Sequence, residues 1–324
     1  MTFVYGAYGL NIRSDISIDF LTPLQADAAI DVTVCFQPDD SVQSNLNALP
    51  WEPPRAGPPH DGIGIGKYGG QLKLLYPRDP HSALEFVISE DAKRVTILRP
   101  GEIPEIDAIS FFIGPVCGVL SRLRSRSCLH ASVLTLNGRA FALTGDKGAG
   151  KSTTSAMLTT CGAMLVADDI GVLSHNNNQF WVQPAYPFMR LSPPEIELTG
   201  RSMADTRELL SVGDKRYVSV EPDGEGGFPL DPLPLDAIYF LSRRGNPDMD
   251  ISIDRLEPNE AARLLNSNGY GHYIMDTAMR RQDFSLFAKF AREKHSRAIS
   301  RPDDLSRLAE LAQMILDNFR ETHD

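Results

Sequence analysis

A nine-residue segment near the middle of the chain, Gly145 to Thr153, constrains the fold more than any other part of the sequence. Its sequence, GDKGAGKST, fits the pattern G-x-x-x-x-G-K-[ST] of phosphate-binding loops. Residues 140–144 before it predict a buried strand, and residues 154–158 after it predict the start of a helix that Gly162 is placed to end. This is the context that the motif requires. The sequence therefore predicts an α/β protein that binds a nucleoside triphosphate.

Each residue type in the loop has a physical role. Glycines let backbone N–H groups approach phosphate oxygens, and the helix N-terminus adds partial positive charge. Lys151 is expected to reach the β- and γ-phosphates, and the Ser152 hydroxyl to ligate Mg²⁺. A glycine-rich turn without a ligand is the alternative interpretation. The residues predicted to hold the triphosphate are Gly145, Asp146, Lys147, Gly148, Ala149, Gly150, Lys151, Ser152 and Thr153.

Composition narrows the class of protein. The 324 residues suffice for two domains, and 42% hydrophobic and 23% charged residues are ordinary for a globular chain. The net charge of −10 argues against nucleic acid or an anionic membrane as the main partner. No signal peptide is evident, the longest apolar run (108–120) is too short to span a bilayer, and the four cysteines lack metal-site spacing. These features predict a cytoplasmic protein with reduced cysteines.

The chain is expected to form two domains with a boundary near Pro100-Gly101. Residues 1–100 predict a β-rich domain, with alternating strands at 14–20 and 30–36 and a long Pro/Gly-rich loop or flap at 37–70. Residues 101–324 form the predicted phosphate-loop domain. Within the flap, a G-x-G-x-x-G match at 64–69 is rejected as a dinucleotide site because the residues after it predict a strand, and a glycine-rich turn is expected instead.

Regular elements are predicted on both sides of the phosphate loop. Asn137-Gly138 is a strong signal for a two-residue hairpin turn between strands. The further predicted strands are 71–76, 84–88, 94–98, 129–136, 164–167, 171–174, 179–183, 237–241 and 251–256. The further predicted helices are 105–123, kinked near Gly114-Pro115, then 257–265, 280–293 and 302–319.

Two acids, Asp168 and Asp169, follow the predicted strand 164–167 and complete the phosphate-loop pattern. One carboxylate at such a strand end can hold Mg²⁺ while the other accepts a proton from an attacking hydroxyl. A solvated turn or a helix cap is the alternative. His130 lies on a strand that the fold would bring to the same edge, although a lone histidine on an apolar strand is more often structural.

Three segments together resemble a known family. Leu129-His130-Ala131-Ser132, the phosphate loop at 145–153 and Leu165-Val166-Ala167-Asp168-Asp169 follow one another as in the catalytic domain of HPr kinase/phosphorylase. They are still more similar to the HPr-kinase-like peptide kinases found with lasso-peptide biosynthesis. The resemblance is specific over 126–173 and diffuse elsewhere, including the first hundred residues.

The resemblance implies a phosphate-loop core like the C-terminal domain of HPr kinase, with an N-terminal β-rich α+β domain. It implies ATP- and Mg²⁺-dependent phosphorylation of a serine on a peptide or protein, such as a ribosomal lasso-type precursor. By position, Asp168 matches the catalytic base, Asp169 an acid that organises the metal site, and His130 a histidine that supports the base. The resembling kinases include hexamers, so the resemblance allows a homo-oligomer.

Two departures from the family weaken particular parts of this expectation. The family usually has glutamate after the loop serine, whereas this chain has Thr153, and its later glycine-arginine signature is absent. Both departures weaken the case for HPr itself as the substrate and for the reverse reaction. The two departures weaken the case for ATP-dependent phosphorylation less.

A transferring phosphoryl group usually needs a further cation besides the loop lysine and Mg²⁺. The candidates for phosphate or acceptor contacts are Arg190, Lys215 and Arg216, each with solvated surface charge as the alternative. The basic stretch 280–301 favours a solvated helix face over a docking surface.

Two other functions fit the same motifs. The first is a nucleotide-dependent switch or scaffold in peptide maturation, which would need one metal-binding acid and no spare base. The second is a kinase of a free small molecule, because acceptor pockets lie in loops that the sequence does not define.

Overall fold

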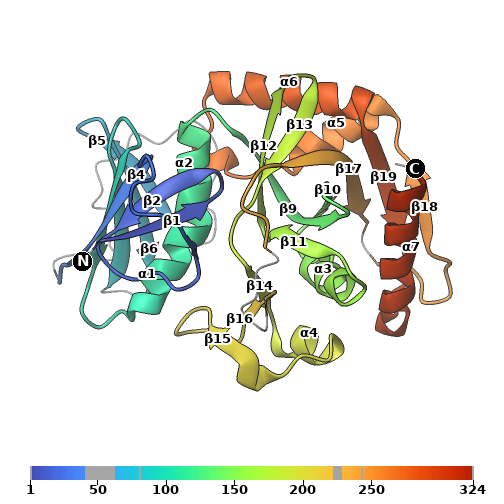
Figure 1. Ribbon diagram of the computed structural model, residues 1–324, viewed down its shortest axis with the longest axis horizontal. Coiled ribbons are helices and arrows are strands. Elements are labelled where there is room, and N and C mark those ends of the chain that lie inside the picture. Colours follow the sequence, from blue (N-terminus) through green and yellow to red (C-terminus); the bar gives the residue numbers. More distant parts are fainter. Residues whose placement is uncertain (1, 41–62, 80–81, 222–227, 243, 323–324) are drawn as a thin grey trace. The chain divides into compact units, whose positions relative to one another are not determined.

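The computed structural model describes residues 2–40, 63–79, 82–221, 228–242 and 244–322 (Figure 1). The chain divides into two compact units. The first comprises residues 1–124, 209–213 and 271–276, and the second comprises residues 125–208, 214–270 and 277–324. This division differs from the boundary expected near residue 100, because the helical segment after that point belongs to the first unit.

The first unit contains one eight-stranded mixed sheet with the strand order β3-β1-β2-β4-β8-β7-β6-β5. Strands β5 to β8 form an antiparallel meander, whereas β4 pairs in parallel with both β2 and β8. The strands are β1 Phe3–Ala7, β2 Leu10–Ser14, β3 Thr22–Pro23, β4 Val32–Pro38, β5 Gly64–Tyr68, β6 Gln71–Pro77, β7 Ala83–Ile88 and β8 Arg94–Arg99. The predicted strands at 30–36, 71–76, 84–88 and 94–98 are therefore confirmed within two residues at each end.

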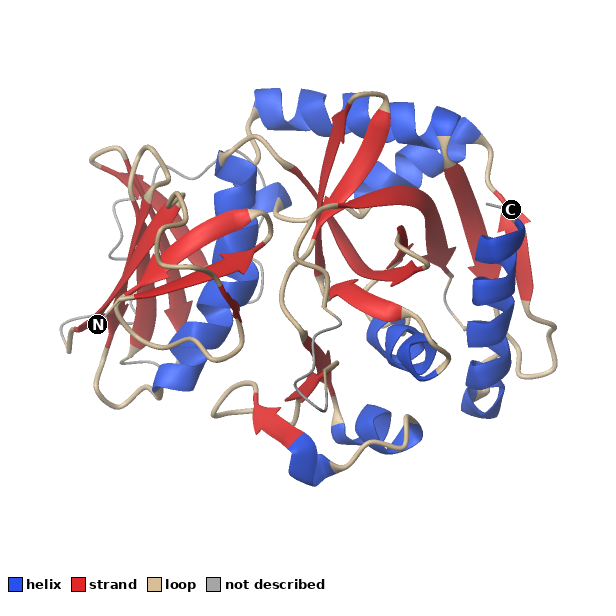
Figure 2. Ribbon diagram, viewed as in Figure 1, coloured by secondary structure: helices blue, strands red, loops and turns tan. Residues whose placement is uncertain are grey.

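One kinked helical segment packs on this sheet (Figure 2). It consists of α1 Glu105–Phe111, a π-helical turn Phe112–Val116 that contains Pro115, and α2 Cys117–Leu123. The proline removes one backbone donor, which accounts for the irregular turn. By length and composition the whole segment from residue 105 to 123 could cross a membrane, although the apolar run expected within it covers only 108–120. However, 78% of its 18-residue window is buried inside the structure, as in a core helix.

Three expectations for the first unit need correction. The strand predicted at 14–20 stops at Ser14, because short polar side chains in this stretch bond locally. The Ser14 hydroxyl accepts from the Ile16 N–H at 3.2 Å, and Ser17 donates to Asp19 at 2.5 Å. The loop expected at 37–70 gives way to strand at both ends, and its middle, 41–62, lies outside the described residues. The glycine-rich turn expected at 64–69 is strand β5 followed by a turn at Gly69–Gly70, and β6 rather than a helix follows.

The second unit is built on a sheet whose central strands are β10 and β17. β10 pairs antiparallel with β9 on one side and parallel with β17 on the other, and β17 pairs parallel with β19. The hairpin β12–β13 joins β9 to the start of β17, while β11 pairs with β9 and β18 with β19. The strands are β9 Ser127–Leu136, β10 Arg139–Thr144, β11 Met164–Ala167, β12 Ile170–Asn176, β13 Gln179–Gln183, β17 Leu233–Leu241, β18 Ser252–Arg255 and β19 His295–Ser300.

A small three-stranded sheet, in the order β14-β16-β15, completes the second unit. Its strands are β14 Phe188–Leu191, β15 Thr206–Glu208 and β16 Arg216–Ser219. The helices of this unit are α3 Lys151–Thr160, α4 Pro193–Leu198, α5 Pro258–Ser267, α6 Thr277–Glu293 and α7 Leu308–Glu321. The predicted turn at Asn137-Gly138 is confirmed, since both residues have positive φ, 53° and 77°. Helix α7 starts later than the expected residue 302, because the Asp304 side chain caps a separate 3₁₀ turn at Leu305–Arg307.

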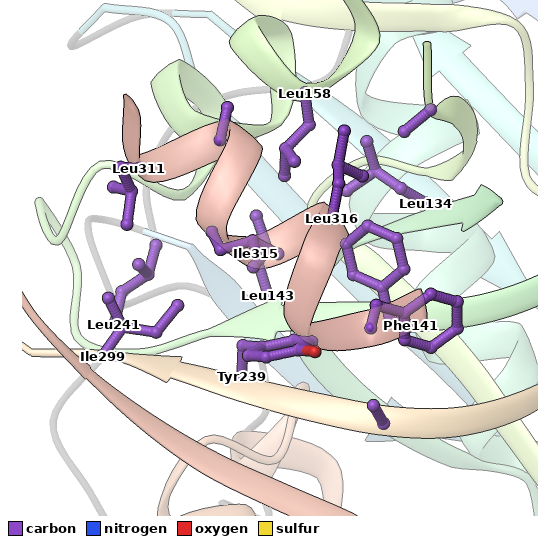
Figure 3. Packing of buried hydrophobic residues seen from close by; sticks show 14 of the residues in the cluster. Leu134, Phe141, Leu143, Leu158, Tyr239, Leu241, Ile299, Leu311, Ile315 and Leu316 are labelled. Carbon is purple, nitrogen blue, oxygen red and sulfur yellow. The ribbon is translucent and has the colours of Figure 1, made fainter. Parts of the chain in front are cut away.

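The main hydrophobic core of this unit lies where α3 and α7 cover β10, β17 and β19 (Figure 3). Phe141 of β10 is fully buried there. Its ring centroid lies 4.8 Å from that of Phe319 on α7 and 5.9 Å from that of Tyr239 on β17. This packing fixes the strand that leads into the phosphate loop.

Replacing Phe141 by alanine should lower the free energy of unfolding by about 3–5 kcal/mol, because it empties space at the centre of this core. Phe284 on α6 is 64% exposed, so Phe284→Ala is the matched control and should change that free energy by less than about 0.5 kcal/mol. Urea unfolding of both variants measures the difference. Equal losses would show that the core does not depend on Phe141.

Candidate active site

The phosphate loop leaves the end of β10 and enters α3 with the backbone that anion binding requires. Three glycines of the loop have backbone conformations that residues with a β-carbon rarely adopt. Their φ values are 144° at Gly145, 83° at Gly148 and 85° at Gly150. A β-carbon at Gly145 would also run into the carbonyl oxygen of Leu241 on β17. The glycines thus allow a backbone conformation that is typical of phosphate-binding loops.

Lys151 is the first residue of α3 and lies against the loop. Its Nζ donates to the carbonyl oxygens of Gly145 at 2.8 Å and Asp146 at 3.2 Å, and the residue is only 8% exposed. Burial lowers the pKa of Lys151, and the negative charge of Asp169 is the strongest opposing influence. The structure thus brings the loop lysine into the electrostatic field of the acid pair.

Asp168 is buried, and each of its two carboxylate oxygens accepts one hydrogen bond. Its Oδ1 accepts from the Ser132 hydroxyl of β9 at 2.9 Å, and its Oδ2 accepts from the Arg190 backbone N–H of β14 at 3.0 Å. Burial raises the pKa of Asp168, and the like charge of Asp169 raises it further. A carboxylate with a raised pKa is a better proton acceptor near neutral pH.

Asp169 is the acid of the pair that solvent reaches, with 29% of its side chain exposed. Its φ of 71° turns the chain sharply between β11 and β12. One carboxylate oxygen lies 3.6 Å from His130 Nδ1, and the other lies 3.5 Å from Arg190 Nη1. The two neighbouring acids therefore have different surroundings: Asp168 is buried, whereas Asp169 is partly exposed to solvent.

His130 connects the acid pair to the phosphate loop. Its backbone carbonyl accepts from the hydroxyl of Thr144, the last residue of β10, at 2.9 Å. Burial lowers the pKa of His130, and the charge of Asp169 only partly offsets this effect. A neutral ring beside Asp169 is the expected form near neutral pH.

Arg190 belongs to the same cluster, as expected. Met189 and Leu191 on either side of it are buried in the small core under β14, so strand alternation turns Arg190 to the opposite face. There its guanidinium donates twice to the Tyr186 hydroxyl, from Nε at 3.0 Å and from Nη2 at 2.7 Å. These bonds fix a positive charge beside Asp169.

The other two candidate cations behave differently. Lys215 is close enough to lower the pKa of both Lys151 and Glu195, so it lies in the field of the site. Arg216 instead bonds to β15, with Nε 3.1 Å from the Thr206 hydroxyl and Nη1 3.8 Å from Glu208. The described contacts of Arg216 thus do not bring it to the acid pair.

Glu195 is a residue near the loop that the sequence analysis missed. The Thr153 hydroxyl donates to its Oε1 at 2.6 Å, while its Oε2 accepts from the backbone N–H and the hydroxyl of Ser192, each at 2.8 Å. Backbone and side-chain hydrogen bonds lower the pKa of Glu195 against the effect of burial. A signal was present, since Ser192-Pro-Pro-Glu195 has the spacing of a capping box.

A divalent cation would have few protein ligands here. In the parts of the chain that the structure describes, no three His, Cys, Asp or Glu side chains come together as a metal cluster. The sequence-based candidates for metal ligands are the Ser152 hydroxyl at the start of α3 and the partly exposed carboxylate of Asp169. This is what Mg²⁺ bound mainly by phosphate oxygens and water requires.

Gly145→Ala should disrupt the loop more than Gly148→Ala. Both glycines have positive φ, but only the Gly145 substitution also meets the Leu241 carbonyl, whereas nothing lies within 4 Å of a β-carbon at Gly148. We expect Gly145→Ala to lower the melting temperature clearly more than Gly148→Ala. Calorimetry on both variants tests this, and equal shifts would contradict the close approach to β17.

Asp168→Asn should keep or raise stability at neutral pH. Because burial raises the pKa of Asp168 above its ordinary 3.8, the folded state binds its proton more tightly than the unfolded state. The ionised carboxylate therefore opposes folding once the pH rises above the raised pKa, and no such cost exists below the ordinary value. The amide still accepts from the Arg190 N–H and can donate to Ser132.

Melting temperatures of wild type and Asp168→Asn between about pH 4 and pH 7 measure this effect. The advantage of the variant should grow as the pH rises. A variant that is less stable than wild type at neutral pH would contradict the account of Asp168 as a buried, costly charge.

The chain shares sequence with a group of bacterial enzymes over less than half its length. It is 30% identical over 162 residues to HPr kinase/phosphorylase of Streptococcus sanguinis SK36, covering 46% of this chain and 49% of the relative. It is 26% identical over 163 residues to the enzyme of that name from Streptococcus thermophilus LMD-9, covering 45% and 52%. The chain thus spans about half the length of the curated relatives it matches, and over that part it is distantly homologous to HPr kinase/phosphorylase.

Other comparisons add little. A solved structure of the Hpr(Ser) kinase/phosphatase from Coxiella burnetii aligns with 60% of this chain and 97% of its own, at 16% identity and a TM-score of 0.29. That score is too low to support an argument about the fold. No protein-family model matches the chain. The comparisons thus show a distant sequence relationship to these kinases, and the mixed α/β fold comes from the structure of the chain itself.

Proposed function

We propose that this chain is an ATP- and Mg²⁺-dependent kinase that phosphorylates a serine hydroxyl on a peptide or protein. The observation that carries the proposal is the position of the acid pair next to the strand that leads into the phosphate loop. Asp169 lies 3.6 Å from His130 Nδ1, and the His130 carbonyl accepts from Thr144 at the end of β10. A phosphate cradle and a carboxylate beside it are the two parts that phosphoryl transfer to an alcohol needs.

In this proposal Asp168 accepts the proton of the serine hydroxyl. The serine oxygen forms a bond to the γ-phosphorus as the bond to the β,γ-bridging oxygen breaks, and ADP leaves with that oxygen. Burial supports this role because it raises the pKa of Asp168. Asp169, which is partly exposed, would organise the metal site, and the neutral His130 beside it would support the acid pair.

Charge on the transferring group would be stabilised by fixed donors. Lys151, the loop N–H groups and the N-terminus of α3 serve the phosphate chain, and Arg190 serves the acceptor side. Ser152 and Asp169 are the residues that would hold Mg²⁺, which neutralises phosphate charge when bound. Because Tyr186 holds the Arg190 guanidinium in place, little reorganisation is needed as charge develops.

The acceptor is proposed from the relatives and from the resemblance. The names of the matched proteins describe kinases that act on HPr, one of them on a serine. Since Thr153 replaces the usual glutamate, we propose a ribosomal precursor peptide of the lasso type rather than HPr. Location in the cytoplasm, self-association into a homo-oligomer, and the absence of nucleic-acid or membrane partners belong to the same proposal.

A kinase fits the site better than a nucleotide switch. A switch needs one acid for the metal, whereas this site holds a second, sealed carboxylate whose pKa is raised. No described feature favours a small-molecule acceptor over a peptide.

The test is transfer of label from ATP labelled on its γ-phosphate to serine-containing precursor peptides in the presence of Mg²⁺. Asp168→Asn should reduce kcat by about 10²–10⁴-fold, as expected for loss of a general base. Asp254→Asn on the exposed edge strand β18 is the matched control and should leave kcat unchanged. Label released only as inorganic phosphate would overturn the proposal, and a larger loss in Asp169→Asn than in Asp168→Asn would move the base to Asp169.

A further inference from the structure

A cavity of about 460 Å³ lies in the second unit, where helix α6 meets the sheet. It is lined by the start of β9 with the two residues before it, by the second half of β12 and by one side of α6. Helix α6 packs across the β12–β13 hairpin (Figure 1), where the Phe290 ring lies 4.9 Å from that of Phe180. The acid pair and the phosphate loop do not line this cavity, so the proposed chemistry leaves it unused.

The charged groups in the wall of this cavity are basic. Arg126 lines it just before β9, and Lys289 lines it from α6. Among the described residues that form the wall, none is Asp or Glu; Glu293, one turn further along α6, lies outside it with its carboxylate 3.9 Å from Lys289 Nζ. The chain as a whole carries a net charge of −10, so a partner with acidic groups would need a local basic site of this kind.

Two buried polar atoms of the wall residues have no hydrogen-bond partner among the described residues. They are the Ser127 hydroxyl and His175 Nε2. Ser127 is only 1% exposed, so bulk water does not satisfy its hydroxyl. Such buried groups cost free energy unless a ligand or a bound water satisfies them. Both groups can donate to a carboxylate, and they therefore add to the two cations as donors for an acidic ligand.

The wall also has an apolar part, formed by Leu173 of β12 and Leu286 of α6. Apolar surface with a few polar groups is typical of sites that bind an organic ligand. A carboxylate on a short hydrocarbon stem, as in a glutamate side chain, matches both parts of the wall. An inorganic anion such as phosphate would match only the basic part.

The strand register places this cavity relative to the acid pair. Ser127 pairs with Leu173 in the ladder between β9 and β12, three residues from the pair formed by His130 and Ile170. Three residues span about 10 Å along a strand. Because side chains alternate, Ser127 and Leu173 face the side of the sheet opposite to the His130 ring. A segment bound in the cavity would therefore be separate from a serine at the acid pair.

We infer that this cavity binds glutamate side chains in a segment of the peptide substrate that is separate from its acceptor serine. The inference rests on the proposed function, from which it takes the peptide as the substrate. Arg126 would bind one carboxylate through paired donors, and Lys289 would bind a second as a point charge. The side chain of Lys289 is 34% exposed, so it can be changed without emptying the core.

Fluorescence anisotropy of the full chain, without nucleotide, tests the inference with two labelled octapeptides, one alternating Glu and Gly and one alternating Gln and Gly. The Glu peptide should bind at least about 10-fold more tightly at low salt, because only its side chains are charged. Lys289→Ala should weaken binding of the Glu peptide by about 3–10-fold, as expected for one partly exposed charged contact. Arg292→Ala is the matched control, since Arg292 is exposed on the same helix and outside the wall, and it should change the affinity by less than about 2-fold.

Ser127→Ala separates a binding role from a structural one. If the hydroxyl serves the ligand, its removal should weaken binding of the Glu peptide by about 3-fold or more and leave the melting temperature of the free chain unchanged or higher. A lower melting temperature with unchanged peptide affinity would contradict the inference.

Equal affinity for the Glu and Gln peptides, or equal losses in Lys289→Ala and Arg292→Ala, would refute the inference. So would inorganic phosphate that binds at this cavity more tightly than the Glu peptide, because the site would then be one for small anions. Peptide binding needs no ATP, so the two proposals fail separately. A chain that binds the Glu peptide but transfers no phosphate would refute only the kinase. Phosphorylation of serine peptides with the same KM whether or not they carry a Glu segment would refute only the inference.

Discussion

The carboxylate of Asp168 holds the candidate site together. One of its oxygens takes the hydroxyl of Ser132 from β9, and the other takes the backbone N–H of Arg190 from β14. The charge is buried, so both hydrogen bonds are needed to offset the loss of solvation. Because one group joins the main sheet to the small sheet, the positions of Asp169, Arg190 and the turn between β11 and β12 all depend on it.

The sheet of the second unit then separates two kinds of chemistry on either side of β10. The side of β9 carries His130 and the acids, and the side of β17 and β19 carries Arg244 and Arg301. The loop at the end of β10 lies between them and meets both.

Most strands and helices near the phosphate loop could be predicted from local sequence. The predictions that failed concern contacts that only the tertiary fold creates. The loop, its glycines and the acids after β11 are fixed by short-range rules, so the sequence predicted their neighbourhood correctly. Arg301 was assigned to a solvated helix face, but it follows strand β19 and is buried, because only the tertiary fold places β19 beside β17. The partnership of Thr153 with Glu195 spans 42 residues and depends on where the small sheet packs. A local sequence pattern therefore does not predict the contact between Thr153 and Glu195.

Glu195 links two elements that the sequence keeps far apart. One oxygen of its carboxylate caps α4 through Ser192, and the other holds the hydroxyl of Thr153 in the first turn of α3. Opening of α4 would therefore release the Thr153 hydroxyl, and unwinding of the first turn of α3 would in turn remove a contact from α4. Helix α4 and the first turn of α3 are thus coupled through one carboxylate, so local unfolding of either helix end should raise amide exchange in the other.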